Sequence, residues 1–161
     1  MEERLGRYQL VRRLGDNDLC DAYTALQHGD GGFVREVLVK RLKDALVTDQ
    51  SALRAFQGEA HLLARLRQRS IPHVYDLQRD AKGGTWFIAL EFIPGPPLKW
   101  VMDTERERAT PIPMALALSV VSQLCAAVHH MHDLTNNYGQ PSELVHRHLA
   151  PENVVLGRDG L

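Results

Sequence analysis

The chain has 161 residues, of which 44% are hydrophobic and 24% are charged. This length and composition are sufficient for one globular domain with a hydrophobic core. Nineteen Lys and Arg residues against 20 Asp and Glu residues give a formal net charge of -1. The chain therefore has no overall basic excess to neutralise a phosphate backbone, and we expect no nucleic acid partner.

The cysteine content and the first residues indicate a reducing compartment. Cys20 and Cys125 could form at most one disulfide, and the start, MEERLGRYQL, has acidic residues and no apolar segment of a secretory signal. The most apolar stretch, residues 114–134, is interrupted by two serines, a glutamine and three histidines. We interpret it as a buried helix that is too polar to span a membrane. A cytoplasmic protein without a membrane partner is expected.

The first half of the chain predicts an antiparallel sheet with one helix. Residues 8–14 and 21–28 flank the turn-rich GDNDLC, and residues 34–42 follow a GDGG turn, so three strands are expected. Residues 74–80 and 86–93 predict a further hairpin around Lys-Gly-Gly. Between them a helix is expected from the N-cap Asp49, with apolar residues on one face: Leu53, Phe56, Ala60 and Leu63.

The second half becomes helical after the cluster PGPP at residues 94–97. Proline withholds a ladder donor and glycine permits sharp changes of direction, so this cluster predicts a hinge. A short helix around residues 98–102 and a charged loop, TERERATPIP, are expected to precede the long helix at 114–134. The alternating charges of residues 103–108 favour a solvated helix end. Residues 154–156 predict a small strand near the end.

This order of elements, together with the segment HRHLAPEN at residues 146–153, resembles a bacterial Ser/Thr protein kinase of the eukaryotic-like type. The resemblance implies an α+β fold. It places a kinase-like N-lobe, with a five-stranded antiparallel sheet and one helix, over residues 1–94. A hinge and a partial, truncated helical C-lobe then occupy residues 95–161.

The resemblance implies residual nucleotide positions. The sequence VLVK puts Lys40 where the family grips the nucleotide phosphates, and Glu59 matches its helix partner. The alternative is a surface ion pair worth roughly 0 to 1 kcal/mol. Gly15 matches the first glycine of the phosphate-covering loop, but Asn17 and Cys20 stand where two more glycines belong. Side chains at these two positions are expected to stiffen the loop that covers the nucleotide phosphates, or to displace it.

Other positions matching the nucleotide site are only partly retained. Leu38 replaces a small alanine that packs against adenine, which is expected to narrow the pocket. The resemblance makes Leu90 the gatekeeper, Glu91 the first hinge residue and Asn153 the second metal ligand. We therefore expect no bound cofactor, although weak ATP binding is possible.

The catalytic loop is degenerate at two positions. His148 stands where the family has the aspartate that orients the attacking hydroxyl, and Ala150 where it commonly has a phosphate-neutralising lysine. Histidine can accept a proton, with an unperturbed pKa of about 6.5. The printed sequence also ends at Leu161, before the DFG segment whose aspartate holds magnesium. We expect a chain that cannot transfer phosphate, with no catalytic residues.

A chain ending at this point would leave the long helix without its usual covering. Each exposed large apolar side chain forgoes roughly 1.5 to 3 kcal/mol, so a protein partner or a second copy is expected. The predicted interaction residues are Leu116, Val120, Val121, Leu124, Val128 and Met131. The alternative is that the sequence is an expression fragment or a degraded gene product.

These features predict a catalytically inactive, truncated pseudokinase that acts as a scaffold or regulator. The alternatives are a nucleotide-binding switch and a split kinase completed by a partner chain. Cys125, His129 and His132 share one helical face, and with His146 or His148 they could bind a metal. We favour a structural role for these side chains, and no metal site is expected.

Overall fold

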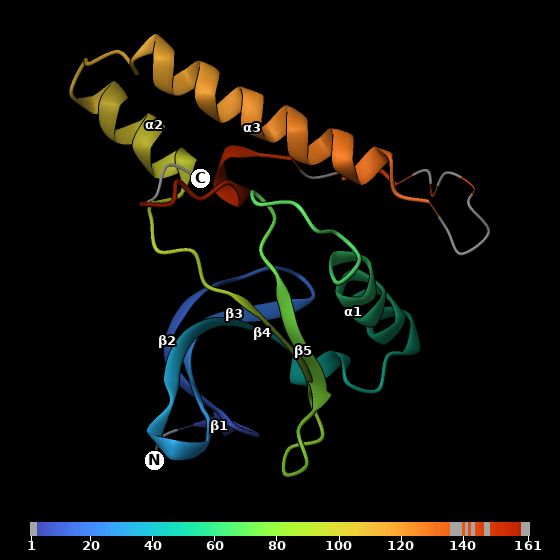
Figure 1. The fold of residues 1–161 in the computed structure, drawn as a ribbon. Coiled ribbons are helices and arrows are strands. Elements are labelled where there is room, and N and C mark those ends of the chain that lie inside the picture. Colours follow the sequence, from blue (N-terminus) through green and yellow to red (C-terminus); the bar gives the residue numbers. More distant parts are fainter. Residues whose placement is uncertain (1–2, 136–139, 141, 143, 147–148, 159–161) are drawn as a thin grey trace. The chain divides into compact units, whose positions relative to one another are not determined.

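The computed structural model describes residues 3–135, 140, 142, 144–146 and 149–158. Its contacts divide the chain into two compact units. The first unit comprises Met1–Arg65 and Pro72–Phe92, and the second comprises Leu66–Ile71 and Ile93–Leu161. The first holds the sheet and one helix, and the second holds two helices (Figure 1). The segment 66–71, which lies within the predicted N-lobe, packs with the second unit.

Within the described residues, the first unit contains one antiparallel sheet of six strands in the order β1-β2-β3-β4-β6-β5. The strands are β1 (Arg4–Leu5), β2 (Tyr8–Asp16), β3 (Cys20–His28), β4 (Val34–Leu42), β5 (Val74–Arg79) and β6 (Trp86–Glu91). The predicted strands are all present. The predicted antiparallel arrangement is confirmed as well.

The prediction of five strands was wrong by one, because it missed β1. This strand has only two residues, too few to show the alternation by which a strand is recognised. It pairs with the start of β2 through Leu5 and Tyr8. Gly6, between the strands, has a φ of +55°, which glycine adopts without a Cβ clash. Leu5 is buried and anchors the short strand to the core.

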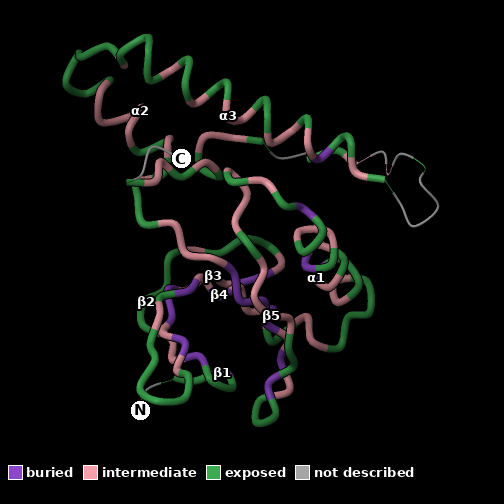
Figure 2. Tube along the Cα trace, in the orientation of Figure 1, coloured by how far each residue is buried: buried purple, intermediate pink, exposed green. Residues whose placement is uncertain are grey.

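The two faces of the sheet are set by the alternation of side chains along β4 and β6. On one face, Val37 and Val39 pack in a core cluster with Tyr8 and Phe87. The rings of Tyr8 and Phe87 meet edge to face, with centroids 5.6 Å apart. Figure 2 shows that buried residues concentrate along these strands.

The other face of the sheet is covered by α1 (Gln50–Leu63). Phe56 and Ala60 of this helix are buried against Leu42 and Ile88. The predicted N-cap, Asp49, is confirmed, because its carboxylate accepts hydrogen bonds from the amides of Ser51 at 2.8 Å and Ala52 at 3.2 Å. The helix therefore begins at the predicted residue.

The second unit contains α2 (Leu98–Glu107) and α3 (Met114–His132). The helix α2 continues past residue 102 into the charged run, so the solvated helix end predicted for residues 103–108 is confirmed and the charged loop begins later than predicted. Charges of alternating sign can pair along a helix face. Lys99 and Asp103, four residues apart, do so at 2.6 Å.

The helix α3 has 19 residues, and an apolar window within it has a mean hydropathy of 1.4. By length and composition it is the one helix in the described residues that could span a membrane, so our expectation that its polar residues exclude a span was wrong on this criterion. The mostly buried core helices of soluble proteins meet the same criterion, so a single such helix is weak evidence for a membrane. Within α3 only Met131 is buried, so the prediction of a buried helix was wrong for this chain.

Two polar contacts join α3 to the segment 66–71 within the second unit. The amide of Arg67 donates to His130 Nε2 at 3.2 Å, and Ser70 Oγ contacts Gln123 Oε1 at 3.4 Å. His130 therefore accepts a backbone hydrogen bond that ties the segment 66–71 to α3.

The segment after α3 pairs with the residues that precede α2. Leu98 N donates to Val154 O at 2.7 Å, and Leu156 N donates to Pro96 O at 3.0 Å. Pro97 and Val155 form an isolated antiparallel bridge between these bonds. The small strand predicted at residues 154–156 is thus present as this bridge.

Candidate functional site

The residues matching the phosphate-gripping lysine and its glutamate partner meet in the first unit. Lys40 lies on β4, on the face covered by α1, and its Nζ donates to Glu59 Oε1 at 2.6 Å. The two side chains are 28% and 36% exposed. The sequence separates them by 19 residues, and the packing of α1 on the sheet brings them together.

The turn between β2 and β3 replaces the glycine-rich loop of the family. Gly15 is paired with Ala22, and a Cβ at Gly15 would meet nothing within 4 Å, so no steric constraint requires glycine there. Asn17 Oδ1 accepts hydrogen bonds from the amides of Leu19 at 2.9 Å and Cys20 at 2.8 Å. The amides of Leu19 and Cys20 are thus bonded within the turn.

Charged side chains surround the same turn. Arg13 pairs with Asp16 at 2.9 Å and with Asp21 at 2.6 Å, and Lys43 pairs with Asp16 at 3.2 Å. The hydrogen bond from Lys43, together with the charge of Arg13, holds the pKa of Asp16 below its usual value. The cations near the turn therefore already have carboxylate partners.

The gatekeeper and hinge positions are held by the sheet. Leu90 is buried, at 3% exposed, and lies opposite Leu38 of β4 in the ladder. Glu91, at the end of β6, is tied to His73. Its amide donates to His73 O at 2.7 Å, and its carboxylate accepts from the His73 amide at 3.2 Å.

The catalytic-loop positions belong to the second unit. His148 lies outside the described residues. Ala150 begins a short 3-10 turn, Pro151–Asn153, in which Asn153 N donates to Ala150 O at 2.9 Å. Asn153 is exposed. Of these catalytic-loop positions, the structure thus describes Ala150 and Asn153.

The predicted interaction residues of α3 differ in their exposure. Leu116 and Val121 are exposed, at 40% and 56%, whereas Met131 is buried at 6%. The remaining members, Val120, Leu124 and Val128, are half-buried. Leu118, which the predicted set omits, is 62% exposed. Exposed apolar residues thus occur along the helix, but Met131 is not part of that surface.

Both cysteines are free thiols. Cys20 is buried in the core cluster that contains Phe56, and this burial raises the pKa of its thiol. Cys125 is exposed on α3. Among the residues for which the structure gives positions, no group of three or more His, Cys, Asp or Glu side chains could hold a metal ion.

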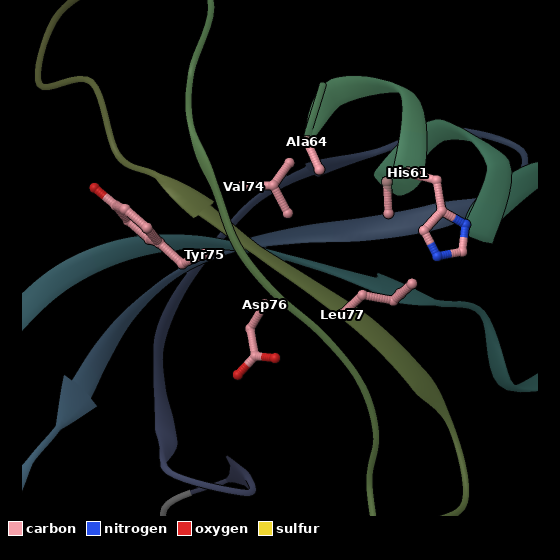
Figure 3. Close-up of a pocket in the computed structure, with 7 residues that line it drawn as sticks. His61, Ala64, Val74, Tyr75, Asp76 and Leu77 are labelled. Atoms are coloured by element: carbon pink, nitrogen blue, oxygen red, sulfur yellow. The ribbon is translucent and has the colours of Figure 1, made fainter. Parts of the chain in front are cut away.

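The first unit also has a hollow that the sequence did not predict. It has a volume of about 360 Å³ and lies between α1 and β5, lined by Ala60, His61, Ala64, Val74, Tyr75, Asp76 and Leu77. Figure 3 shows His61 and Leu77 on one side of β5 and Tyr75 on the other. Its lining carries none of the predicted site residues.

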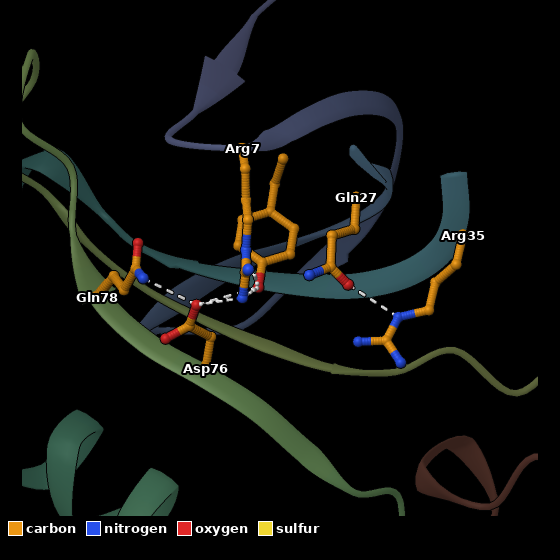
Figure 4. Close-up of polar contacts among 6 residues, drawn as sticks. Arg7, Gln27, Arg35, Asp76 and Gln78 are labelled. Atoms are coloured by element: carbon orange, nitrogen blue, oxygen red, sulfur yellow. Dashed lines mark hydrogen bonds and ion pairs between the residues drawn. The ribbon is translucent and has the colours of Figure 1, made fainter. Parts of the chain in front are cut away.

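A polar cluster around Asp76 was also missed. Its Oδ2 accepts hydrogen bonds from Arg7 at 3.1 Å, from the Tyr8 hydroxyl at 3.2 Å and from Gln78 at 2.8 Å (Figure 4). Burial raises the pKa of Tyr8. Asp76 lies 68 residues from Tyr8, and no local pattern signals such a contact. We infer that this cluster holds β5 against the start of β2.

Comparison with known proteins identifies the family. The model of the protein tyrosine and serine/threonine kinase family matches residues 8–161. The tyrosine-protein kinase MasK of Myxococcus xanthus is 28% identical over 155 residues, which cover 96% of this chain and 24% of MasK. The serine/threonine-protein kinase PksC of Streptomyces coelicolor is 30% identical over 158 residues, covering 97% of this chain and 26% of PksC.

A solved structure gives the same result for the fold. The crystal structure of the PknI kinase domain of Mycobacterium tuberculosis superposes with a TM-score of 0.69 and is 26% identical. The match covers 97% of this chain and 58% of that kinase domain. The chain thus spans about a quarter of the two curated relatives and little more than half of the kinase domain. The chain belongs to the protein tyrosine and serine/threonine kinase family.

Proposed function

We propose that this chain is a catalytically inactive member of the kinase family that acts through protein contacts, as a scaffold or regulator. The observation that carries the proposal is His148, which occupies the position of the catalytic aspartate. An aspartate there supplies a fixed negative charge that orients the attacking hydroxyl. Histidine supplies at most a neutral acceptor near neutral pH, so the proton transfer loses its electrostatic support.

Two further features support catalytic loss. Ala150 replaces a lysine that in many relatives neutralises the transferring phosphoryl group. The turn between β2 and β3 also does not fit the nucleotide phosphates, because Asn17 occupies the amides of Leu19 and Cys20. Positioning and charge neutralisation provide most of the catalysis in phosphoryl transfer, so losses of both kinds weaken the same step.

The residues that the structure describes support a binding role. The sheet retains two buried core clusters, and the ion pair between Lys40 and Glu59 is formed. On α3, Met114, Leu118 and Val121 are 73%, 62% and 56% exposed. Exposed apolar groups that cluster on one element commonly mark protein contacts. We therefore place the proposed contact surface on α3.

The catalytic part of the proposal is tested by phosphoryl transfer from labelled ATP with magnesium, using the chain alone and a Lys40→Met variant. We expect no transfer that depends on Lys40. Lys40-dependent labelling of the chain or of an added substrate would overturn the proposal. Labelling that appears only when a second protein is added would favour a split kinase instead.

The contact surface is tested by sedimentation of the wild-type chain and two matched double variants. Leu118→Glu with Val121→Glu places two charges on the apolar surface, and Ser119→Glu with Ser122→Glu places two charges on exposed polar positions of the same helix. We expect concentration-dependent association that only the first pair abolishes. A wild-type chain that stays monomeric at high concentration would exclude self-association and leave a different protein as the partner.

The alternative of a nucleotide-binding switch is favoured by one observation, the contact between Lys40 and Glu59 at 2.6 Å. In active kinases this pair must be in place for the nucleotide to be held productively. Calorimetry with ATP and magnesium separates the two functions. A binding signal that disappears in Lys40→Met would favour the switch, and its absence in the wild type would favour the scaffold.

A further inference from the structure

Three backbone amides of the turn between β2 and β3 donate hydrogen bonds within the turn itself. Asn17 Oδ1 accepts the amides of Leu19 at 2.9 Å and Cys20 at 2.8 Å, and the Asn17 amide donates to Cys20 O at 3.0 Å. An Asn side chain that accepts from amides two and three residues ahead closes a compact local turn. Three backbone groups that could bind an anion or water are therefore bonded inside the turn.

The turn is also fixed to the rest of the first unit. The amide of Lys43 donates to Leu19 O at 3.1 Å, so the turn is tied to the end of β4. The side chain of Cys20 is only 3% exposed and packs in the core cluster of Phe56 and Leu42. Opening the turn would break these bonds and withdraw a buried side chain from the core.

The charges around the turn disfavour an anion. Asp16, Asp18 and Asp21 place three carboxylates within six residues. Arg13 and Lys43, the cations that contact this region, are paired with two of them, Asp16 and Asp21. A triphosphate approaching the turn would meet the exposed carboxylate of Asp18 and cations that already have partners.

We propose that the β2–β3 turn is a self-capped turn that rejects nucleotide phosphates, and that Asn17 is the residue that determines this. The inference rests on the proposed function, since it explains how a chain with a formed Lys40–Glu59 pair avoids holding ATP. It goes further by assigning the loss to one side chain. Removing the Asn17 acceptor frees the amides of Leu19 and Cys20 for a phosphate.

The test is Asn17→Gly, with Asp18→Gly as the matched control. Both variants add one glycine to the same turn, but only the first removes the acceptor of the two amides. Asp18→Gly removes one exposed carboxylate, so it should raise the affinity for ATP less than Asn17→Gly does. Breaking two intramolecular hydrogen bonds on phosphate binding weakens affinity by about tenfold, so we expect Asn17→Gly to bind ATP with magnesium about tenfold more tightly than the wild type. Adenosine, which lacks phosphates, serves as the second ligand and its affinity should not change.

Hydrogen exchange gives a readout that is independent of binding. In the wild type the amides of Leu19 and Cys20, which donate to Asn17 Oδ1, should exchange more slowly than the amide of Asp18, which does not. In Asn17→Gly their protection should fall, and in Asp18→Gly it should persist. This measurement on the wild type alone keeps the proposal falsifiable if a variant does not fold.

Three results would overturn the inference. The first is that the wild-type amides of Leu19 and Cys20 exchange as fast as that of Asp18. The others are equal affinities of the wild type and Asn17→Gly for ATP with magnesium, or a gain in that affinity in Asp18→Gly as large as in Asn17→Gly. Its failure is distinct from that of the proposed function. A wild-type chain that binds ATP tightly without transferring phosphate would contradict the self-capped turn and leave the proposed catalytic inactivity in place, whereas phosphoryl transfer by the wild type would contradict the proposed function.

Discussion

The ammonium group of Lys40 on β4 lies 2.6 Å from a carboxylate oxygen of Glu59 on α1, and this contact joins the sheet to the helix that covers it. The side chains are 28% and 36% exposed, so water screens much of their attraction. The contact therefore preserves a kinase-like arrangement while adding little to stability.

Replacing Glu59 should accordingly have a small effect on folding. We expect Glu59→Gln to lower the free energy of unfolding by less than about 1 kcal/mol, measured by urea denaturation. Phe56→Ala, in the same helix but fully buried, is the comparison, and it should cost about 3 to 5 kcal/mol. A loss for Glu59→Gln as large as that for Phe56→Ala would show that the ion pair is a main structural contact.

The carboxylate of Asp80 should make the free energy of unfolding depend on pH in the acidic range. It is 7% exposed, and its carboxylate accepts from the amides of Gly83 at 2.6 Å, Lys82 at 3.1 Å and Gly6 at 3.3 Å. The hydrogen bond from Gly83 is the largest cause that lowers the pKa of Asp80. Because the folded-state pKa lies below the unfolded value of about 3.9, the carboxylate stabilises the fold above that pH.

That stabilisation should be lost as the pH falls through the folded-state pKa. We expect Asp80→Asn to cost about 1 to 3 kcal/mol at pH 7 and progressively less below about pH 4. Urea denaturation of both proteins across this pH range provides the measurement, with the exposed Asp18→Asn as the control. A difference that stays constant down to pH 2 would mean that the charge of Asp80 is not involved.

Gly95 should be intolerant of a side chain. A Cβ at this position would lie 1.9 Å from Leu156 O and 2.7 Å from Leu156 C, which are backbone atoms that cannot rotate away. We expect Gly95→Ala to lower the free energy of unfolding by about 1 to 3 kcal/mol and to speed hydrogen exchange at the amide of Leu156.

Gly58→Ala is the matched control for this variant. Gly58 is exposed within α1, and an added Cβ there meets nothing within 4 Å. Alanine in a helix interior is more stable than glycine by about 0.5 to 1 kcal/mol. Equal effects of the two substitutions would show that the segment before α2 does not pack on Leu156.

The two cysteines should differ in reactivity. Burial both hides the thiol of Cys20 and raises its pKa, whereas Cys125 is exposed. A thiol reagent at pH 8 should label Cys125 first and Cys20 at least about tenfold more slowly, because the thiolate is the reactive form. In Cys125→Ser only the slow reaction should remain. Rapid labelling of that variant would place Cys20 on the surface.

Local chemistry made much of the first unit predictable. Asp49 was recognised as an N-cap because a short acidic side chain precedes apolar residues at helical spacing, and it caps α1 as expected. The strand β1 was missed because its pairing depends on Leu5 entering the core, which two residues cannot reveal. The sequence left the end of α2 open between residue 102 and the charged run, because charged residues suit a loop and a solvated helix end equally well.

The site was predictable only through the family pattern. Nothing in the spacing of Lys40 and Glu59 indicates contact, since they lie on a strand and a helix, and their meeting followed from the resemblance. The same comparison marked Asn17 as a departure from glycine. It did not show that the side chain would bond the amides of Leu19 and Cys20, because that depends on the conformation of the turn.

Phosphoryl transfer by the purified wild-type chain can be measured by incubating it with γ-labelled ATP and magnesium and counting the label on the chain and on a general protein substrate. Lys40→Met, prepared in parallel, sets the background. For a catalytically inactive chain we expect the two proteins to give the same signal. Wild-type labelling well above that of Lys40→Met would show that the chain transfers phosphate.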